Sequence, residues 1–146
     1  MERIVTGILI AASLLTLTSC RTRTLYNPPP TDFSVTNLEK VEAAILNGMT
    51  RQGWAAEVKQ PGLIEGRLDL GRHAATVQVE YSDHEYQISY VSSQKMMYER
   101  HTDGSVSIHR NYNTYIRDLE KEIDFNLGVK KPSWWSGTHS SSHEAR

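Results

Sequence analysis

The chain has 146 residues, of which 38% are hydrophobic, and its formal net charge at pH 7 is −1. This length and composition predict one globular domain with flanking segments. The near-neutral charge argues against a nucleic-acid partner, because non-specific binding to nucleic acid needs a strongly basic surface. A single cysteine, Cys20, excludes an intramolecular disulfide, a cysteine-based zinc site and a CxxC redox pair.

Residues 1–19 have the pattern of a signal peptide. Their apolar run, Ile4 to Leu17, has about 14 residues, whereas a transmembrane helix needs roughly 20. The run leads into Leu17-Thr18-Ser19-Cys20, which resembles the lipobox of bacterial lipoproteins. An ordinary signal peptide followed by a chance cysteine is the alternative.

The lipobox resemblance implies cleavage before Cys20, a diacylglyceryl thioether on its thiol and acylation of the new amine, as in palmitate-bearing lipoproteins. A thiol suits this chemistry because it is a strong nucleophile near neutral pH. Arg21 follows the cysteine, where aspartate would favour the inner membrane. The resemblance therefore implies a protein anchored by lipid in the outer membrane and facing the periplasm.

Residues 20–35 are predicted to be a tether. Three consecutive prolines favour an extended polyproline II segment, which would hold the domain away from the lipid. Arg21 and Arg23 either contact anionic head groups or are simply solvated.

The folded domain is predicted to span residues 36–127, and it opens with a helix. Thr36 and Glu39 form a capping-box pattern, and Gly53 favours the end of the helix. Gly48 inside the helix allows either a close approach to a neighbouring element or slack. The apolar residues at helical spacing are Leu38, Val41, Ile45 and Met49.

After Gly53 the apolar residues recur every second position, which is typical of strands. Four such segments, at 54–59, 63–70, 74–81 and 85–93, predict an antiparallel meander. The residues expected to face the core are Trp54, Ala56, Val58, Ile64, Gly66, Leu68, Leu70, Ala75, Val77, Val79, Tyr81, Tyr86, Ile88 and Tyr90. The residues expected on the opposite face are Glu57, Glu65, Arg67, Asp69, Gln78, Glu80, Gln87 and Ser89.

A second helix closes the domain, with Asn111 as the candidate N-cap and Gly128 just beyond its end. Glu120 lies outside the apolar stripe and is expected to be exposed. Before this helix, Asp103-Gly104 turns a short hairpin or belongs to an irregular loop. The stripe consists of Tyr112, Tyr115, Ile116, Leu119, Ile123 and Leu127.

Together these elements predict an α+β fold: a two-layer sandwich in the order helix, four-stranded antiparallel meander, helix, with both helices on one face of the sheet. Residues 128–146 lack any period and are predicted to form a disordered tail. Within the tail, Trp134 and Trp135 stand beside two lysines. They would contact a membrane interface, a glycan or a partner's groove, or fold back on the domain.

No motif points to catalysis, a cofactor or a metal site. The six histidines form no HExxH pattern, and the chain has no GxSxG, GxGxxG or P-loop. Glu57 and Glu65 could oppose each other across two strands, as an acid/base pair or as part of a solvated face.

The densest polar and aromatic cluster is Ile108-His109-Arg110-Asn111-Tyr112-Asn113. At a helix N-terminus, His109, Arg110, Asn111 and Asn113 could hold an anionic group of a partner. In the structural alternative, Asn111 caps the helix, Tyr112 enters the core and His109 satisfies a buried carbonyl.

The domain also resembles a group of small, largely uncharacterised proteobacterial lipoproteins, a likeness that implies no activity. We therefore expect a non-enzymatic binding or scaffolding module that is held on the membrane by lipid and contacts an envelope protein or glycan. The alternative is a carrier of a small ligand or lipid, with a cleft between helices and sheet. The residues that carry the resemblance are Gly53, Trp54, Gly62, Ile64, Gly66, His73, Ala75, Tyr81, Tyr90, Tyr98 and the segment 108–113.

Overall fold

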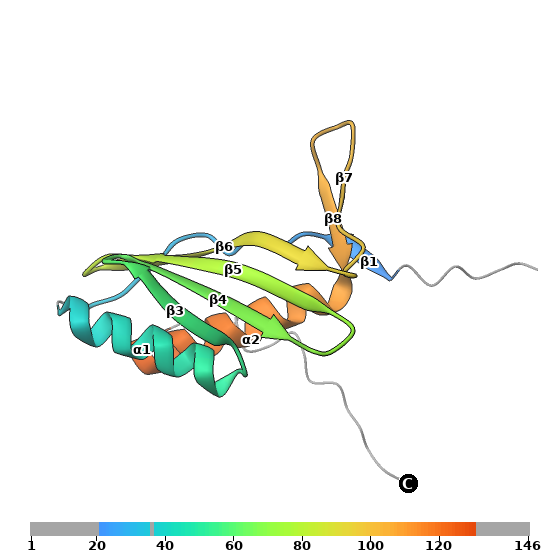
Figure 1. The fold of residues 1–146 in the computed structure, drawn as a ribbon. Coiled ribbons are helices and arrows are strands. Elements are labelled where there is room, and N and C mark those ends of the chain that lie inside the picture. Colours follow the sequence, from blue (N-terminus) through green and yellow to red (C-terminus); the bar gives the residue numbers. More distant parts are fainter. Residues whose placement is uncertain (1–20, 36, 131–146) are drawn as a thin grey trace, which may run out of the picture.

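The computed structural model describes residues 21–35 and 37–130 (Figure 1). The elements follow in the order β1 (Thr22–Thr24), β2 (Thr31–Asp32), α1 (Leu38–Arg51), β3 (Ala55–Gln60), β4 (Leu63–Asp69), β5 (Ala74–Tyr81), β6 (Glu85–Gln94), β7 (Glu99–Arg100), β8 (Val106–His109) and α2 (Arg110–Leu127).

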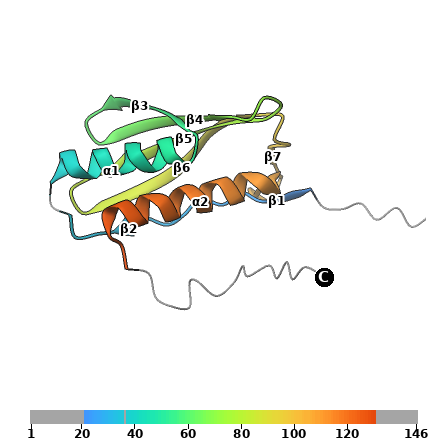
Figure 2. The same ribbon diagram turned by 90° about the horizontal axis from the view of Figure 1, so that it is seen from below.

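The predicted α+β sandwich is confirmed. Strands β3 to β6 form the antiparallel meander, and β2 extends it to a five-stranded sheet in the order β2-β6-β5-β4-β3. Both helices cover the same face of this sheet (Figures 1 and 2). A smaller sheet, β1-β8-β7, lies at one end of the molecule. Its β7–β8 hairpin, which turns at Gly104 (φ 85°), is the hairpin that Asp103-Gly104 favours.

The space between helices and sheet is filled by side chains from both layers. Gly48 brings the helices together, since a Cβ at this position would lie 2.9 Å from Ile123 Cγ1 and 3.2 Å from its backbone nitrogen. Of the two alternatives for Gly48, the structure therefore has the close approach. Side chains with no more than 1% exposure in this layer include Val41, Ile45, Met49, Ile64, Val77, Val79, Ile88, Ile116, Leu119 and Ile123.

Three inward predictions are wrong, each at the end or edge of an element. Leu38 is the first residue of α1 and is 42% exposed. Val58 is 38% exposed, because β3 is the edge strand and its register shifts between Val58 and Gln60. Leu70 is 43% exposed, because β4 ends one residue earlier.

Both predicted N-caps are displaced. Asn37 caps α1, and its side-chain oxygen accepts a hydrogen bond from the Lys40 backbone N–H at 3.0 Å; the predicted cap, Thr36, lies outside the described residues. At α2 the cap is His109, and the predicted cap Asn111 supplies the backbone N–H that the imidazole accepts. Gly128 follows the end of α2, as predicted, and has the left-handed conformation.

Residues 21–35 do not form the predicted free tether. β1 pairs with β8, and β2 pairs with the edge of β6, so this N-terminal segment runs along the domain (Figure 2). This course removes the apolar side chains of the segment from water, whereas an extended tether would leave them exposed to water. The domain therefore begins near Arg21 and not at residue 36. The side chains packed on the core are Leu25, Tyr26, Phe33 and Val35.

Two carboxylates of α2 are buried and hydrogen-bonded by tyrosines, one from the N-terminal segment and one from β6. Glu120, expected to be exposed, is only 2% exposed and accepts a hydrogen bond from the Tyr26 hydroxyl at 3.0 Å. Asp124 is 4% exposed and accepts one from the Tyr86 hydroxyl at 2.6 Å. Burial and the adjacent Glu120 carboxylate raise the pKa of Tyr26 to about 12.

Candidate functional site

The predicted site residues divide into two groups. Cys20, Trp134 and Trp135 lie outside the described residues, so their roles stay predictions. The other four, His109, Arg110, Asn111 and Asn113, come together at the junction of β8 and α2.

Asn113 has a structural role in this junction. The side chain is 7% exposed, and its Oδ1 accepts the Tyr26 backbone N–H at 3.0 Å. Its Nδ2 donates to the Thr24 carbonyl at 2.8 Å. Because its amide oxygen and nitrogen are both engaged, Asn113 holds the N-terminal segment on α2. Its part in partner binding stays a prediction.

His109 faces a second imidazole. Its ring lies 5.6 Å from the ring of His73, with an interplanar angle of 27°. The Nδ1 of His109 accepts the Asn111 N–H at 3.3 Å, so it does not satisfy a buried carbonyl as the structural alternative supposed. Burial lowers the pKa of His109, and the positive charges of His73 and Arg110 lower this pKa further.

These two histidines line a pocket of about 540 Å³, which we call the histidine pocket. One wall of the pocket is formed by two neighbouring turns. Because Ala74 of β5 pairs with Gln94 of β6, the β4–β5 turn lies beside the turn that follows β6. Pairing of β1 with β8 supplies the opposite wall, where Thr22 lies opposite His109. The lining residues are Arg21, Arg72, His73, Lys95, Met97 and His109.

A second basic pocket, of about 630 Å³, lies between β1 and α2. Its basic residues are partly engaged, since Lys121 lies 4.0 Å from Asp118 and the Arg117 guanidinium lies 4.4 Å from the centre of the Tyr26 ring. The lining residues are Arg23, Thr24, Arg110, Asn113, Thr114, Arg117, Asp118 and Lys121.

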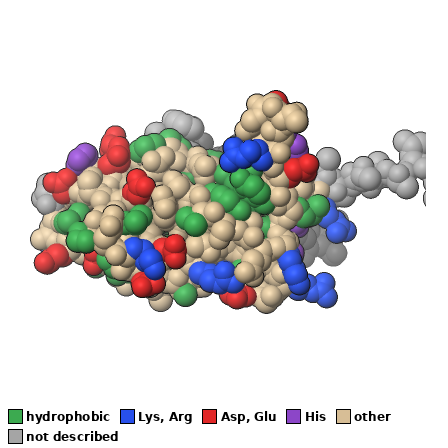
Figure 3. Space-filling model, turned by 45° about the horizontal axis from the view of Figure 1, so that its top comes forward, with side chains coloured by type: hydrophobic (Ala, Val, Ile, Leu, Met, Phe, Trp, Pro, Cys, Tyr) green, Lys and Arg blue, Asp and Glu red, His purple; other side chains and the backbone are tan. Residues whose placement is uncertain are grey.

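The two pockets define a basic end of the molecule. Seven of the 16 Lys and Arg residues of the chain line them, against one carboxylate, Asp118. Figure 3 shows Lys and Arg side chains toward the β1 end of the molecule, whereas Asp and Glu prevail toward the opposite end. The chain as a whole is therefore almost neutral, but its positive and negative charges are concentrated toward opposite ends of the molecule. The residues of the basic end are Arg21, Arg23, Arg72, Lys95, Arg110, Arg117 and Lys121.

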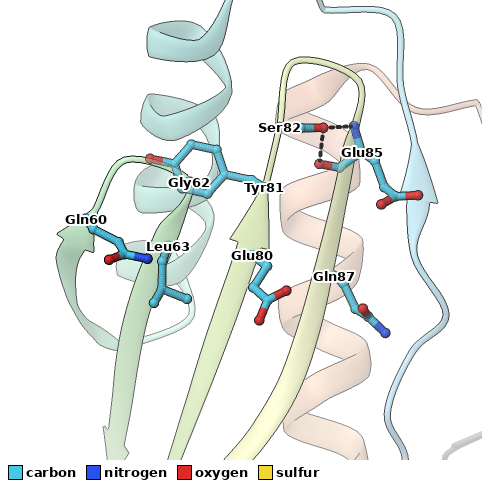
Figure 4. A pocket seen from close by; sticks show the side chains of 8 residues that line it. All are labelled: Gln60, Gly62, Leu63, Glu80, Tyr81, Ser82, Glu85 and Gln87. Atoms are coloured by element: carbon cyan, nitrogen blue, oxygen red, sulfur yellow. Dashed lines mark hydrogen bonds between the residues drawn. The ribbon is translucent and has the colours of Figure 1, made fainter.

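A third hollow, of about 390 Å³, lies at the opposite end of the sheet (Figure 4). Leu63, Glu80 and Gln87 lie side by side there across three strands, and Glu80 accepts a hydrogen bond from Gln78 at 3.0 Å. The ring of Tyr81 points away from this row, toward Gly62 (Figure 4). The hollow is thus an open polar surface in which Glu80 already has a hydrogen-bond donor.

The outer face of the sheet is polar, as predicted. Glu57 and Glu65 lie directly opposite each other, and the Lys59 ammonium is 3.0 Å from one carboxylate and 4.0 Å from the other. The cation offsets the repulsion between the two carboxylates, which is typical of a solvated ladder. Among the described residues, no group of three or more His, Cys, Asp or Glu side chains is placed to hold a metal ion.

Comparison of the chain with protein-family models, with curated proteins and with solved structures finds no match. Within the part of the chain that the structure describes, neither helix has the length and apolar character needed to cross a membrane.

Proposed function

We propose that this protein is a lipid-anchored lipoprotein of the cell envelope that binds or scaffolds another envelope component and performs no chemistry of its own. The proposal rests on the lipobox at Leu17 to Cys20 and on one structural observation. The basic end of the domain begins at Arg21, the residue that follows the cysteine.

This position matters because electrostatic attraction is short-ranged. One residue spans at most about 3.8 Å, and charges are screened beyond roughly 8–10 Å at physiological salt. A lipid on Cys20 would therefore keep Arg21 within reach of anionic head groups, and each basic residue near such a surface contributes roughly 1 kcal/mol. The polar sheet face and the opposite end of the domain would stay open to a protein or glycan partner in the periplasm.

The packing between the layers favours this function over the carrier alternative. A carrier needs an apolar cavity of at least the volume of its ligand. In the described residues, the helix–sheet layer is filled, and Met49 of α1 occupies the space that a Cβ on Gly66 would need. The three hollows reported above lie at the surface and are lined mainly by polar or charged residues.

The experiment that tests the anchor is metabolic labelling with a fatty-acid probe. We expect the wild-type protein to incorporate the probe and to fractionate with outer membranes. We expect Cys20→Ser to incorporate none and to accumulate as the longer precursor. Equal labelling of the two proteins would contradict the proposal.

A further inference from the structure

The histidine pocket concentrates positive charge without a counter-charge. Arg21, Arg72 and Lys95 line it, and none of the carboxylates in the described part of the chain forms an ion pair with these three side chains. Like charges around one pocket repel, and the repulsion persists unless an anion enters.

The backbone around the pocket is held in place by hydrogen bonds. The N–H of His109 donates to the Met96 carbonyl at 2.7 Å, and the N–H of Arg110 donates to the Arg21 carbonyl at 2.9 Å. The residues on either side of Met96, Lys95 and Met97, each have φ 54°, a left-handed conformation that non-glycine residues rarely adopt. Such conformations persist only where the surroundings enforce them, so the walls are pre-formed.

The two imidazoles add hydrogen-bond donors to this charge. The Nδ1 of His73 lies 2.7 Å from the Lys95 carbonyl, which only accepts, so Nδ1 carries the proton. The Nδ1 of His109 accepts the Asn111 N–H, so the proton of its neutral ring is on Nε2. The neutral ring of His109 therefore offers Nε2–H as a donor, whereas His73 offers an Nε2–H only when both of its ring nitrogens carry protons.

We propose that the histidine pocket binds a phosphate group, carried either by a lipid head group or by a soluble phosphorylated molecule. Phosphate presents several strong acceptor oxygens with negative charge, and guanidinium forks match this geometry. A carboxylate is less suited, because it has two oxygens for a pocket lined by five nitrogen-bearing side chains. Every residue of the pocket belongs to the described domain, so the inference holds whether or not Cys20 carries lipid.

The test titrates inorganic phosphate into the full-length protein in a nonionic detergent, with the histidine ring signals followed by NMR. We expect saturable shifts of His73 and His109 and a raised pKa of His109, since a bound anion stabilises its imidazolium. His84, at the opposite end of the molecule and hydrogen-bonded to Asp83 at 2.7 Å, should not respond.

Matched substitutions separate pocket binding from general charge. Arg72→Gln should weaken phosphate binding about tenfold, the loss of roughly one charge-assisted hydrogen bond. Arg67→Gln changes the net charge equally on the outer sheet face and should stay within about twofold. Both arginines are exposed, so both variants should keep the wild-type thermal melting curve. Equal weakening in the two variants, or no saturable shift in the wild type, would overturn the proposal.

A second arm identifies the source of the phosphate. The protein is placed in nanodiscs of phosphatidylcholine, with or without phosphatidylglycerol. Shifts of His73 and His109 that require phosphatidylglycerol and are lost in Arg72→Gln indicate a lipid head group. Shifts produced in pure phosphatidylcholine only by added glycerol 3-phosphate, and again lost in Arg72→Gln, indicate a soluble ligand. Shifts in either arm that Arg72→Gln leaves intact would contradict the proposal.

Discussion

The amide side chain of Asn113 makes two hydrogen bonds between α2 and the N-terminal segment. It bridges a backbone N–H and a backbone carbonyl of that segment, at Tyr26 and Thr24. A buried polar group left without its partner costs about 1–3 kcal/mol, so the amide matters more than its size suggests.

We predict that Asn113→Ala lowers the free energy of unfolding by about 1–3 kcal/mol and speeds hydrogen exchange of the Tyr26 amide. Asn111→Ala is the matched control, because Asn111 is exposed and contributes only its backbone N–H to the His109 cap. It should stay within about half a kcal/mol of the wild type. Equal effects in denaturant melts would show that the bridge contributes nothing.

At the same scale, the sequence predicts which apolar side chains of the helices and inner strands are buried, because period and burial coincide there. It does not predict the burial of Glu120 and Asp124. Their cover comes from Tyr26 and Tyr86, residues 94 and 38 positions away. No local pattern encodes such contacts.

At the scale of elements, α1 and α2 approach each other closely where α1 has Gly48. The Arg51 guanidinium also meets the Glu122 carboxylate at 3.2 Å, but this exposed pair contributes at most about 1 kcal/mol. Packing of Gly48 against Ile123 therefore sets the distance between the helices.

We predict that Gly48→Ala destabilises the domain by about 1–3 kcal/mol, although alanine is the better helix former by about 1 kcal/mol. The added methyl would meet the Ile123 backbone, which cannot move without α2. Thr50→Ala, at an exposed position of the same helix, should be neutral or slightly stabilising. A stabilised Gly48→Ala in thermal melts would contradict this packing.

The elements themselves are predictable where they are long. Strands β3 to β6 have six to ten residues, enough for alternation to show. Strands β1 and β2 have three and two residues, too few for a period, and the neighbouring prolines favour an extended tether instead. Their pairing depends on partners at β8 and β6, which the sequence does not indicate.

At the scale of the whole molecule, positive and negative charges lie toward opposite ends, although the net charge is only −1. The basic end collects residues from the N-terminal segment, two turns and α2, so composition conceals it. One part was accessible from the sequence: the predicted meander already places His73 at the same end of the sheet as Lys95. The contribution of Arg21 to the basic end could not be predicted from the sequence, because it requires the pairing of β1 with β8.

An orientation with the basic end toward the membrane is tested most directly by site-specific fluorescence quenching in reconstituted vesicles. A fluorophore is attached to an introduced cysteine in one of two variants, Thr114→Cys or Asp83→Cys. Thr114 lines the second basic pocket, Asp83 lies in the β5–β6 turn, and both positions are exposed. A lipidated Cys20, the only cysteine of the chain, leaves the introduced thiol as the single labelling site. With a quencher on the lipid head groups of anionic vesicles, we predict strong quenching at position 114 and little at position 83. Equal quenching at both positions, or stronger quenching at position 83, would contradict the orientation.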